Sequence, residues 1–134
     1  MVAKTKLIPL VPIKKMNRAV KFYTDKLGAK VVMRGTGSMK EFWSSLSLAG
    51  SEIWFVKPSK PEKIKLAYLT LNVPKFSPFV KRLQKNGVKF DKADRMSKET
   101  RIEGPIAHEA WGSSAYFWDS EGNLWMVWQN PPGM

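Results

Sequence analysis

The stretch Asn17-Arg-Ala-Val-Lys-Phe-Tyr-Thr-Asp-Lys-Leu-Gly28 decides the fold of this chain. Its apolar residues recur at helical spacing, and Gly28 follows them where a glycine commonly ends a helix in the left-handed conformation. A second stretch, Phe76–Gln84, repeats the pattern, and Gly87 follows it 59 residues after Gly28. Two similar stretches at this offset indicate an internal duplication.

Short apolar runs surround each helical stretch in the same order, and Ile53-Trp-Phe-Val56 is echoed by Leu124-Trp-Met-Val127. We predict an α+β fold of two βαβββ modules, whose curved mixed sheets enclose a cleft. One domain spans residues 1–134, with module one at about 5–57, a linker at about 58–65 and module two at about 66–130. The expected strands are Leu7–Val11, Val31–Met33, Phe42–Leu48 and Ile53–Val56, then Ala67–Val73, Val88–Phe90, Ala115–Trp118 and Leu124–Trp128.

The composition is that of one folded domain. The chain has 134 residues, of which 43% are apolar, and it has six tryptophans. No apolar run approaches the roughly 20 residues that span a bilayer, and the first residues lack a signal-peptide pattern, so we expect a cytoplasmic protein without a membrane partner. The chain has no cysteine, which excludes disulfides and thiolate chemistry.

The net charge of +12, from 23 basic and 11 acidic residues, raises nucleic acid as a partner. Most of the basic residues are lysines spread along predicted helices and loops, rather than gathered in one arginine-rich stripe. A solvated lysine-rich surface explains this distribution, so nucleic acid is disfavoured as a partner.

Two motifs resemble a known family. Phe22-Tyr-Thr-Asp-Lys-Leu-Gly28 resembles the first-helix signature of the glyoxalase, bleomycin-resistance and extradiol-dioxygenase group, the vicinal oxygen chelate superfamily. Trp111-Gly112, followed by Phe117, Asp119 and Glu121-Gly-Asn123, is similar to its C-terminal hairpin signature. The resemblance covers nearly the whole chain and implies the two-module fold. It leaves the function open, because this scaffold hosts isomerases, dioxygenases, thiol transferases and drug-binding proteins.

The resemblance also implies a divalent metal, held by His and Glu from the first strand of each module and the last strand of each hairpin. In this chain the matching positions are Ile8, Tyr68, Met126 and either Trp54 or Phe55. Apolar and aromatic side chains do not supply the converging N, O or S donors that a divalent metal needs. We therefore expect no metal and no cofactor.

The remaining candidates are aromatic residues and one histidine. His108, the only histidine, lies in an expected loop, where it is a hydrogen-bonded loop residue, a ligand contact or a general base. Ordinary core packing is the alternative for each tryptophan. No catalytic residue is assigned. The predicted ligand-binding residues are Trp43, Trp54, Tyr68, His108, Trp111, Met126 and Trp128.

Together with these features, the resemblance implies a homodimeric small-molecule binding protein of the bleomycin-resistance type, which confers antibiotic resistance by holding an aromatic compound. Bleomycin-type proteins bind a cationic drug in an acidic groove, whereas this chain is basic, so we expect an anionic or neutral guest. The alternative is a glyoxalase-like lyase, isomerase or dioxygenase with an atypical site.

Overall fold

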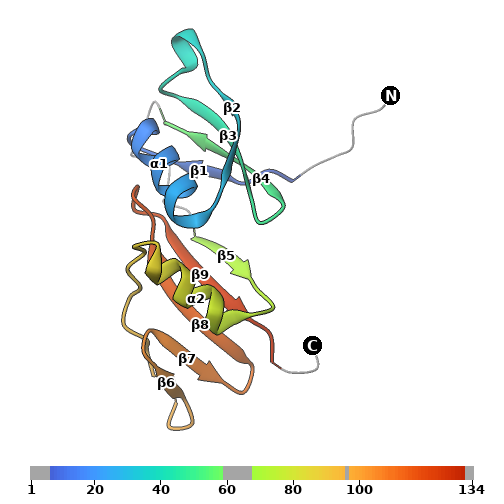
Figure 1. Cartoon of the computed structure of the whole chain (residues 1–134), viewed down its shortest axis with the longest axis vertical. Helices are drawn as coiled ribbons and strands as arrows, with labels where there is room; N and C mark the ends of the chain where they lie inside the picture. The colour runs from blue at the N-terminus through green and yellow to red at the C-terminus, as the bar shows by residue number, and fades with distance from the viewer. Residues whose placement is uncertain (1–6, 59–67, 96, 132–134) are drawn as a thin grey trace, which may run out of the picture. The chain divides into compact units, whose positions relative to one another are not determined.

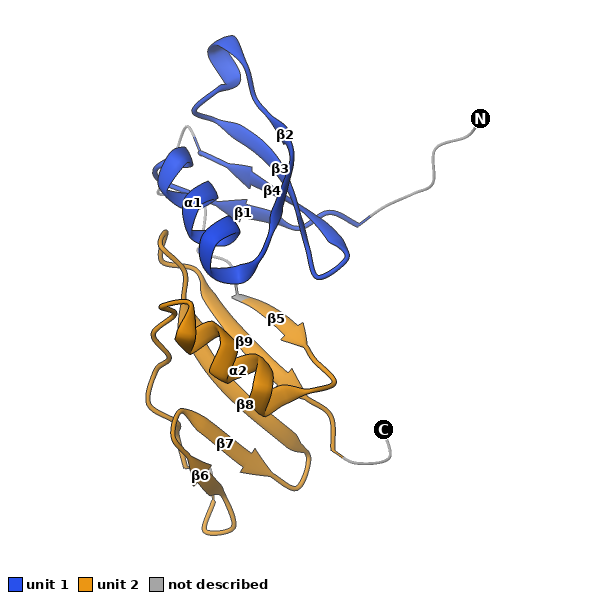
Figure 2. Cartoon of the chain, in the orientation of Figure 1, with its two compact units in different colours: residues 1–65 blue, residues 66–134 orange. Residues whose placement is uncertain are grey.

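The computed structural model describes residues 7–58, 68–95 and 97–131 (Figure 1). Contacts divide the chain into two compact units, Met1–Lys65 and Leu66–Met134 (Figure 2). Each unit carries a helix on one face of a mixed sheet, which confirms the predicted α+β class. The predicted linker, apart from Pro58, lies outside the described residues. No helix of the described residues is long and apolar enough to cross a membrane.

The first unit contains a four-stranded sheet in the order β1-β4-β3-β2. β1 is parallel to β4, whereas the other pairs are antiparallel. The short first strand therefore lies at a sheet edge, as its prolines predict. The elements are β1 (Leu10–Pro12), α1 (Met16–Leu27), β2 (Lys30–Arg34), the 3-10 turn η1 (Gly37–Met39), β3 (Trp43–Leu48) and β4 (Ser51–Val56).

The helix α1 packs on this sheet through the predicted apolar stripe. Ala19, Tyr23 and Leu27 are buried, and the Tyr23 ring meets Phe55 edge to face at 4.6 Å between centroids. Gly28 ends the helix with φ of 75°, a left-handed conformation that glycine adopts at little cost.

The second unit contains a five-stranded sheet in the order β5-β9-β8-β7-β6. β5 is parallel to β9, and the remaining pairs are antiparallel. Figure 1 shows α2 lying across the face of β8 and β9. The elements are β5 (Tyr68–Asn72), α2 (Phe76–Lys85), β6 (Arg101–Glu103), β7 (Ile106–Glu109), β8 (Gly112–Trp118) and β9 (Leu124–Gln129).

The second unit departs from the predicted strands. The expected strand Val88–Phe90 is wrong, because only Phe90 pairs, in an isolated bridge with Phe117. The segment that follows α2 reaches only the second half of β8. The first half of β8, at Gly112–Ser114, is already paired with β7. The hairpin of β6 and β7 was not expected, and it places His108 in a strand rather than the predicted loop.

Alternation along β8 and β9 gives the second sheet two different faces. Ala115 pairs with Val127, and Phe117 pairs with Trp125; all four side chains are buried on the face that α2 covers. Neighbouring residues in a strand point to opposite faces. Ser114, Tyr116, Met126 and Trp128 therefore lie on the other, open face.

Candidate ligand-binding site

The open face of the second sheet carries a pocket of about 420 Å³. Its floor comes from alternate residues of three adjacent strands, and one wall comes from the loop after Phe90. The volume lies within the roughly 300–1,000 Å³ that is typical of small-molecule pockets. The lining residues are Asp91, Lys92, Ala93, Asp94, Pro105, Ala107, Glu109, Trp111, Ser114, Tyr116, Leu124 and Trp128.

The indole ring of Trp128 lies against β8 because residue 112 is glycine. A Cβ atom at Gly112 would lie 2.6 Å from the Gln129 carbonyl oxygen and would overlap the Trp128 ring. Gly112 also has φ of 142°, which disfavours any side chain there. The ring nitrogen Nε1 of Trp128 donates a hydrogen bond to Oδ1 of Asn130 at 2.9 Å. The aromatic surface is thus held in one orientation at the pocket.

The loop wall of the pocket is tied to the sheet at Asp91. The backbone N–H of Asp91 donates to the Tyr116 carbonyl at 2.8 Å, and Trp118 Nε1 donates to Asp91 Oδ2 at 2.9 Å. The loop is thereby held beside Tyr116, whose side chain forms part of the lining.

The lining is acidic, in contrast to the whole chain. It contains the carboxylates of Asp91, Asp94 and Glu109 against the single ammonium of Lys92. Glu109 Oε1 accepts a hydrogen bond from Thr100 Oγ1 at 2.6 Å. The local charge is therefore negative, although the chain carries +12.

The structure brings two of the predicted ligand-binding residues into this pocket. Trp128 lines the floor, and Trp111, with 56% of its surface exposed, lines the rim. Met126 lies on the same open face, where it is the cross-strand partner of Tyr116. The Tyr68 backbone pairs with Leu124, and its side chain lies outside the described part of the structure.

Trp43 and Trp54 lie together in the first unit, on the open face of its sheet. Their rings meet edge to face at 5.5 Å between centroids. Trp54 Nε1 and Ser45 Oγ both donate to Oε2 of Glu52, at 2.7 and 3.1 Å. Phe55 is fully buried against α1 on the other face, so Trp54 is the open-face residue of this pair.

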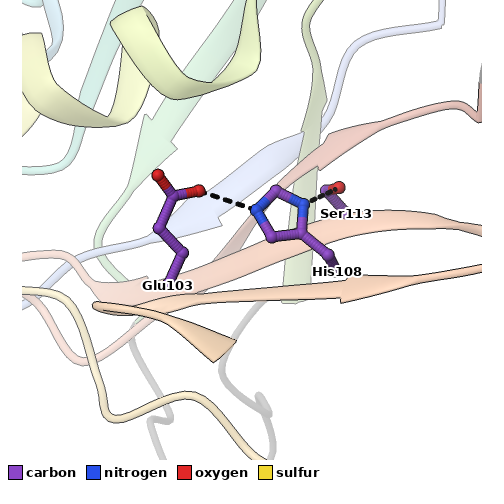
Figure 3. Close-up of polar contacts among 3 residues, drawn as sticks. All are labelled: Glu103, His108 and Ser113. Atoms are coloured by element: carbon purple, nitrogen blue, oxygen red, sulfur yellow. Dashed lines mark hydrogen bonds and ion pairs between the residues drawn. The ribbon is translucent and has the colours of Figure 1, made fainter. Parts of the chain in front are cut away.

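His108 lies on the α2 face of the second sheet, opposite the pocket, where it joins two neighbouring strands. Its Nδ1 atom is 2.7 Å from Ser113 Oγ, and its Nε2 atom is 2.8 Å from Glu103 Oε1 (Figure 3). The neutral ring satisfies both contacts when Nε2–H donates to Glu103 and Nδ1 accepts the Ser113 hydroxyl proton. The hydrogen bond from His108 lowers the pKa of Glu103 below its usual value of about 4.5, and the charges of Arg101 and Lys81 add to this effect. This cluster connects β6, β7 and β8.

Sequence reasoning missed Tyr116 and the acidic loop. Tyr116 shares the open face with Trp128, and strand alternation finds it only when the register of β8 against β9 is known. Asp91–Asp94 follow no periodic pattern, so no local signal marks them as a pocket wall.

The positions that correspond to the family's metal ligands do not fit a metal. The structure describes no group of three or more His, Asp or Glu side chains that could hold an ion. Trp54 donates its ring N–H to Glu52, and Met126 lies among open-face residues with aromatic neighbours. The Trp54 and Met126 side chains are therefore not a donor set that suits a divalent metal.

Comparison with known proteins gives a family match and several structural relatives. Residues 8–127 match the family model described as Glyoxalase/Bleomycin resistance protein/Dioxygenase superfamily. No curated protein matches the sequence.

The solved structures resemble the chain in fold. TioX from Micromonospora sp. ML1 aligns with a TM-score of 0.72 at 13% identity, over 95% of this chain and 99% of TioX. TnmS3, an antibiotic binding protein from Streptomyces sp. CB03234, has a TM-score of 0.68 at 20% identity, over 97% of this chain and 98% of its own. A bleomycin resistance determinant encoded on the transposon Tn5 has a TM-score of 0.66 at 21% identity, over 95% and 98%. At these identities the likeness shows the fold alone.

Proposed function

Because the chain belongs to the glyoxalase/bleomycin resistance protein/dioxygenase superfamily, we propose that it is a metal-independent binding protein of the bleomycin-resistance type. It holds a small aromatic molecule, such as an antibiotic, in the pocket of the second unit. The structural relatives described as an antibiotic binding protein and as a bleomycin resistance determinant support this class of function.

The observation that carries the proposal is the aromatic pocket itself. Trp128 is fixed against β8 by Gly112, and Tyr116 and Trp111 complete an aromatic lining of a volume of about 420 Å³. Rigid aromatic rings contribute large contact area at a low entropic cost, and planar guests stack on them. An ordered pocket of this kind favours a flat guest over an aliphatic one.

The charge of the pocket lining further restricts the chemical class of the guest. The net charge of the chain predicts an anionic or neutral guest, whereas the pocket lining has three carboxylates and one ammonium. Local charges dominate over distant ones in salt, because the Debye length is about 8 Å at physiological ionic strength. A neutral aromatic compound satisfies both arguments, and we propose this class.

The proposed contact residues are Trp111 and Trp128, with Met126 and Tyr68 from the same sheet. Trp43 and Trp54 form an aromatic pair on the open face of the first unit's sheet, and we propose them separately as a ligand contact of that unit. His108 points to the opposite face of the second sheet and is not part of the proposed pocket.

A matched ligand series tests the proposal. The full chain is titrated with 2-naphthol, 2-naphthoate and 2-naphthylmethylammonium, and tryptophan fluorescence and calorimetry report binding. We expect micromolar binding of the neutral compound and weaker binding of the anion. Trp128→Ala should weaken the binding of 2-naphthol by about 1–3 kcal/mol, because a stacked anchor is removed.

Phe42→Ala is the control variant, since Phe42 is an exposed aromatic residue outside the pocket. It should leave the affinity unchanged. The proposal fails if only aliphatic compounds bind, or if Trp128→Ala and Trp111→Ala both bind as tightly as the wild type.

We also propose that the protein is a homodimer in the cytoplasm. The alternative function is that of a glyoxalase-like lyase, isomerase or dioxygenase with an atypical site. Elemental analysis of the purified protein separates the two functions. About one zinc, nickel, iron or manganese per chain would favour the enzyme, whereas a chain without stoichiometric metal that binds 2-naphthol would favour the binding protein.

A further inference from the structure

A second pocket lies in the first unit, where β2 ends and the chain turns toward β3. Its volume is about 480 Å³, and its lining residues are Asn17, Arg34, Gly35, Thr36, Gly37 and Lys40. Two of these six residues are cations and none is a carboxylate, which is the opposite of the balance in the aromatic pocket. A concave surface with this charge attracts an anion.

Arg34 is held at the pocket by the first turn of α1. Its Nη2 atom donates a hydrogen bond to Asn17 Oδ1 at 2.9 Å, the only side-chain hydrogen bond that Arg34 makes within the described residues. Its Nε atom is buried and has no hydrogen-bond partner in the part of the chain that the structure describes. A guanidinium has five N–H donors and pairs with two oxygens of one oxyanion. Arg34 is thus oriented by Asn17 and retains donors for such a group.

The loop that carries Thr36 has a defined backbone before any ligand binds. A Cβ atom at Gly35 would lie 2.8 Å from the Trp43 carbonyl oxygen, so the chain passes too close for a side chain. Gly37 has φ of 57°, a left-handed conformation that favours glycine. The Met39 N–H donates to the Thr36 carbonyl at 3.0 Å. Little conformational entropy is lost on binding when the loop is already ordered.

We propose that this pocket binds a small oxyanion with a phosphate or sulfate group. Arg34 supplies paired donors, Lys40 supplies a second positive charge, and Thr36 belongs to the same lining. The site belongs to the first unit, so it is independent of the aromatic pocket of the second unit.

Nuclear magnetic resonance of the nitrogen-15-labelled full chain tests this site. Inorganic phosphate is added while sodium chloride keeps the ionic strength constant. The amide signals of Gly35, Thr36 and Gly37 should shift and saturate, and sulfate should compete. Lys40→Gln and Arg34→Gln should each weaken phosphate binding roughly fivefold or more, because each removes one charge-assisted contact.

Lys89→Gln is the matched control, since it removes one exposed positive charge from the second unit. It should leave phosphate binding unchanged. Arg34→Lys keeps the charge and loses the paired donors, so it should weaken binding. Lys40→Gln covers the case in which changes at Arg34 unfold the chain.

Amide shifts that do not saturate with phosphate, or an equal loss of affinity in Lys89→Gln, would overturn the proposal. Binding of single-stranded DNA without a response to phosphate would also overturn it. Lys40→Gln should bind 2-naphthol normally, which separates this test from that of the aromatic pocket.

Discussion

The turn between β8 and β9 is closed by the carboxylate of Asp119. Its Oδ1 atom accepts the backbone N–H groups of Glu121 and Asn123, each at 2.8 Å, and its Oδ2 atom accepts from Asn123 Nδ2 at 2.9 Å. Asp119, Glu121 and Asn123 are all buried. The part of the family signature that contains these three residues therefore stabilises the hairpin that carries Trp128, and it lies outside the pocket lining.

Asp119→Ala should lower the free energy of unfolding by about 2–4 kcal/mol, because it leaves two buried backbone donors without a partner. Asp119→Asn keeps an acceptor at Oδ1 and should cost less. Urea unfolding of the two variants and the wild type measures the difference. A change below about 0.5 kcal/mol in Asp119→Ala would show that the turn closes without this carboxylate.

At the scale of single elements, the sequence predicted those parts of the fold that have a local signal. The stripe of α1 and its glycine end are periodic features, and the hairpins of β3 with β4 and β8 with β9 are apolar runs with turn residues between them. β6 has no such signal, since its three residues are all exposed and two are charged. Its pairing with β7 comes from the turn at Gly104, where φ is 58°.

The same limit applies to the candidate site. Large aromatic residues such as Trp111 and Trp128 stand out in a sequence, and both line the pocket. Which face each strand residue occupies depends on register, which is a long-range property. His108 shows this, because the structure places it beside Ser113 on the α2 face, whereas the sequence alone left a ligand contact open.

The cluster of Glu103, His108 and Ser113 joins three strands and should respond to acid. The folded pKa of Glu103 is lowered, chiefly by the hydrogen bond from His108, so the stabilisation is present above the unfolded value of about 4.5. It is lost as the pH falls through the lowered folded pKa. Glu103→Gln should therefore be less stable than the wild type at neutral pH, and the difference should disappear in acid.

Thermal unfolding from pH 7 to pH 3 measures this effect. Glu99→Gln is the control for removing an exposed carboxylate from the same unit. A difference between Glu103→Gln and the wild type that stays constant, or grows, as the pH falls below about 4.5 would contradict the role of the ionised Glu103 carboxylate as the acceptor of the His108 hydrogen bond.

At the scale of the whole molecule, the net charge of the chain does not predict the charge of its pocket linings. The chain carries +12, yet the aromatic pocket has three carboxylates to one lysine, and the pocket lined by Arg34 and Lys40 has two cations and no carboxylate. The excess of lysine elsewhere contributes to solubility and to salt-dependent encounter with anions. Ligand classes are therefore better inferred from each lining than from the sum of charges.

The homodimer predicted from the sequence has a structural candidate for its contact. β2 is an edge strand of the first sheet, and Val31, Val32 and Met33 are 42%, 57% and 58% exposed. Consecutive exposed apolar residues on an edge are a liability unless another surface covers them. The register of β2 shifts between Val31 and Met33, and a bulge interrupts the backbone ladder that strand addition needs. Side-chain packing rather than strand addition should thus join the two copies.

Sedimentation velocity at micromolar concentration should show a species of twice the chain mass of 15.3 kDa. Val32→Lys places a charge among the exposed apolar residues of β2 and should shift the chain to the monomer, because burying an unpaired ammonium is unfavourable. Met39→Lys adds the same charge at an exposed apolar residue outside the strand, and it should remain dimeric. A wild-type chain that stays monomeric at about 100 µM would contradict the dimer. A dimer that Val32→Lys leaves intact would move the interface away from β2, and the exposed side chains of this strand would then need another partner.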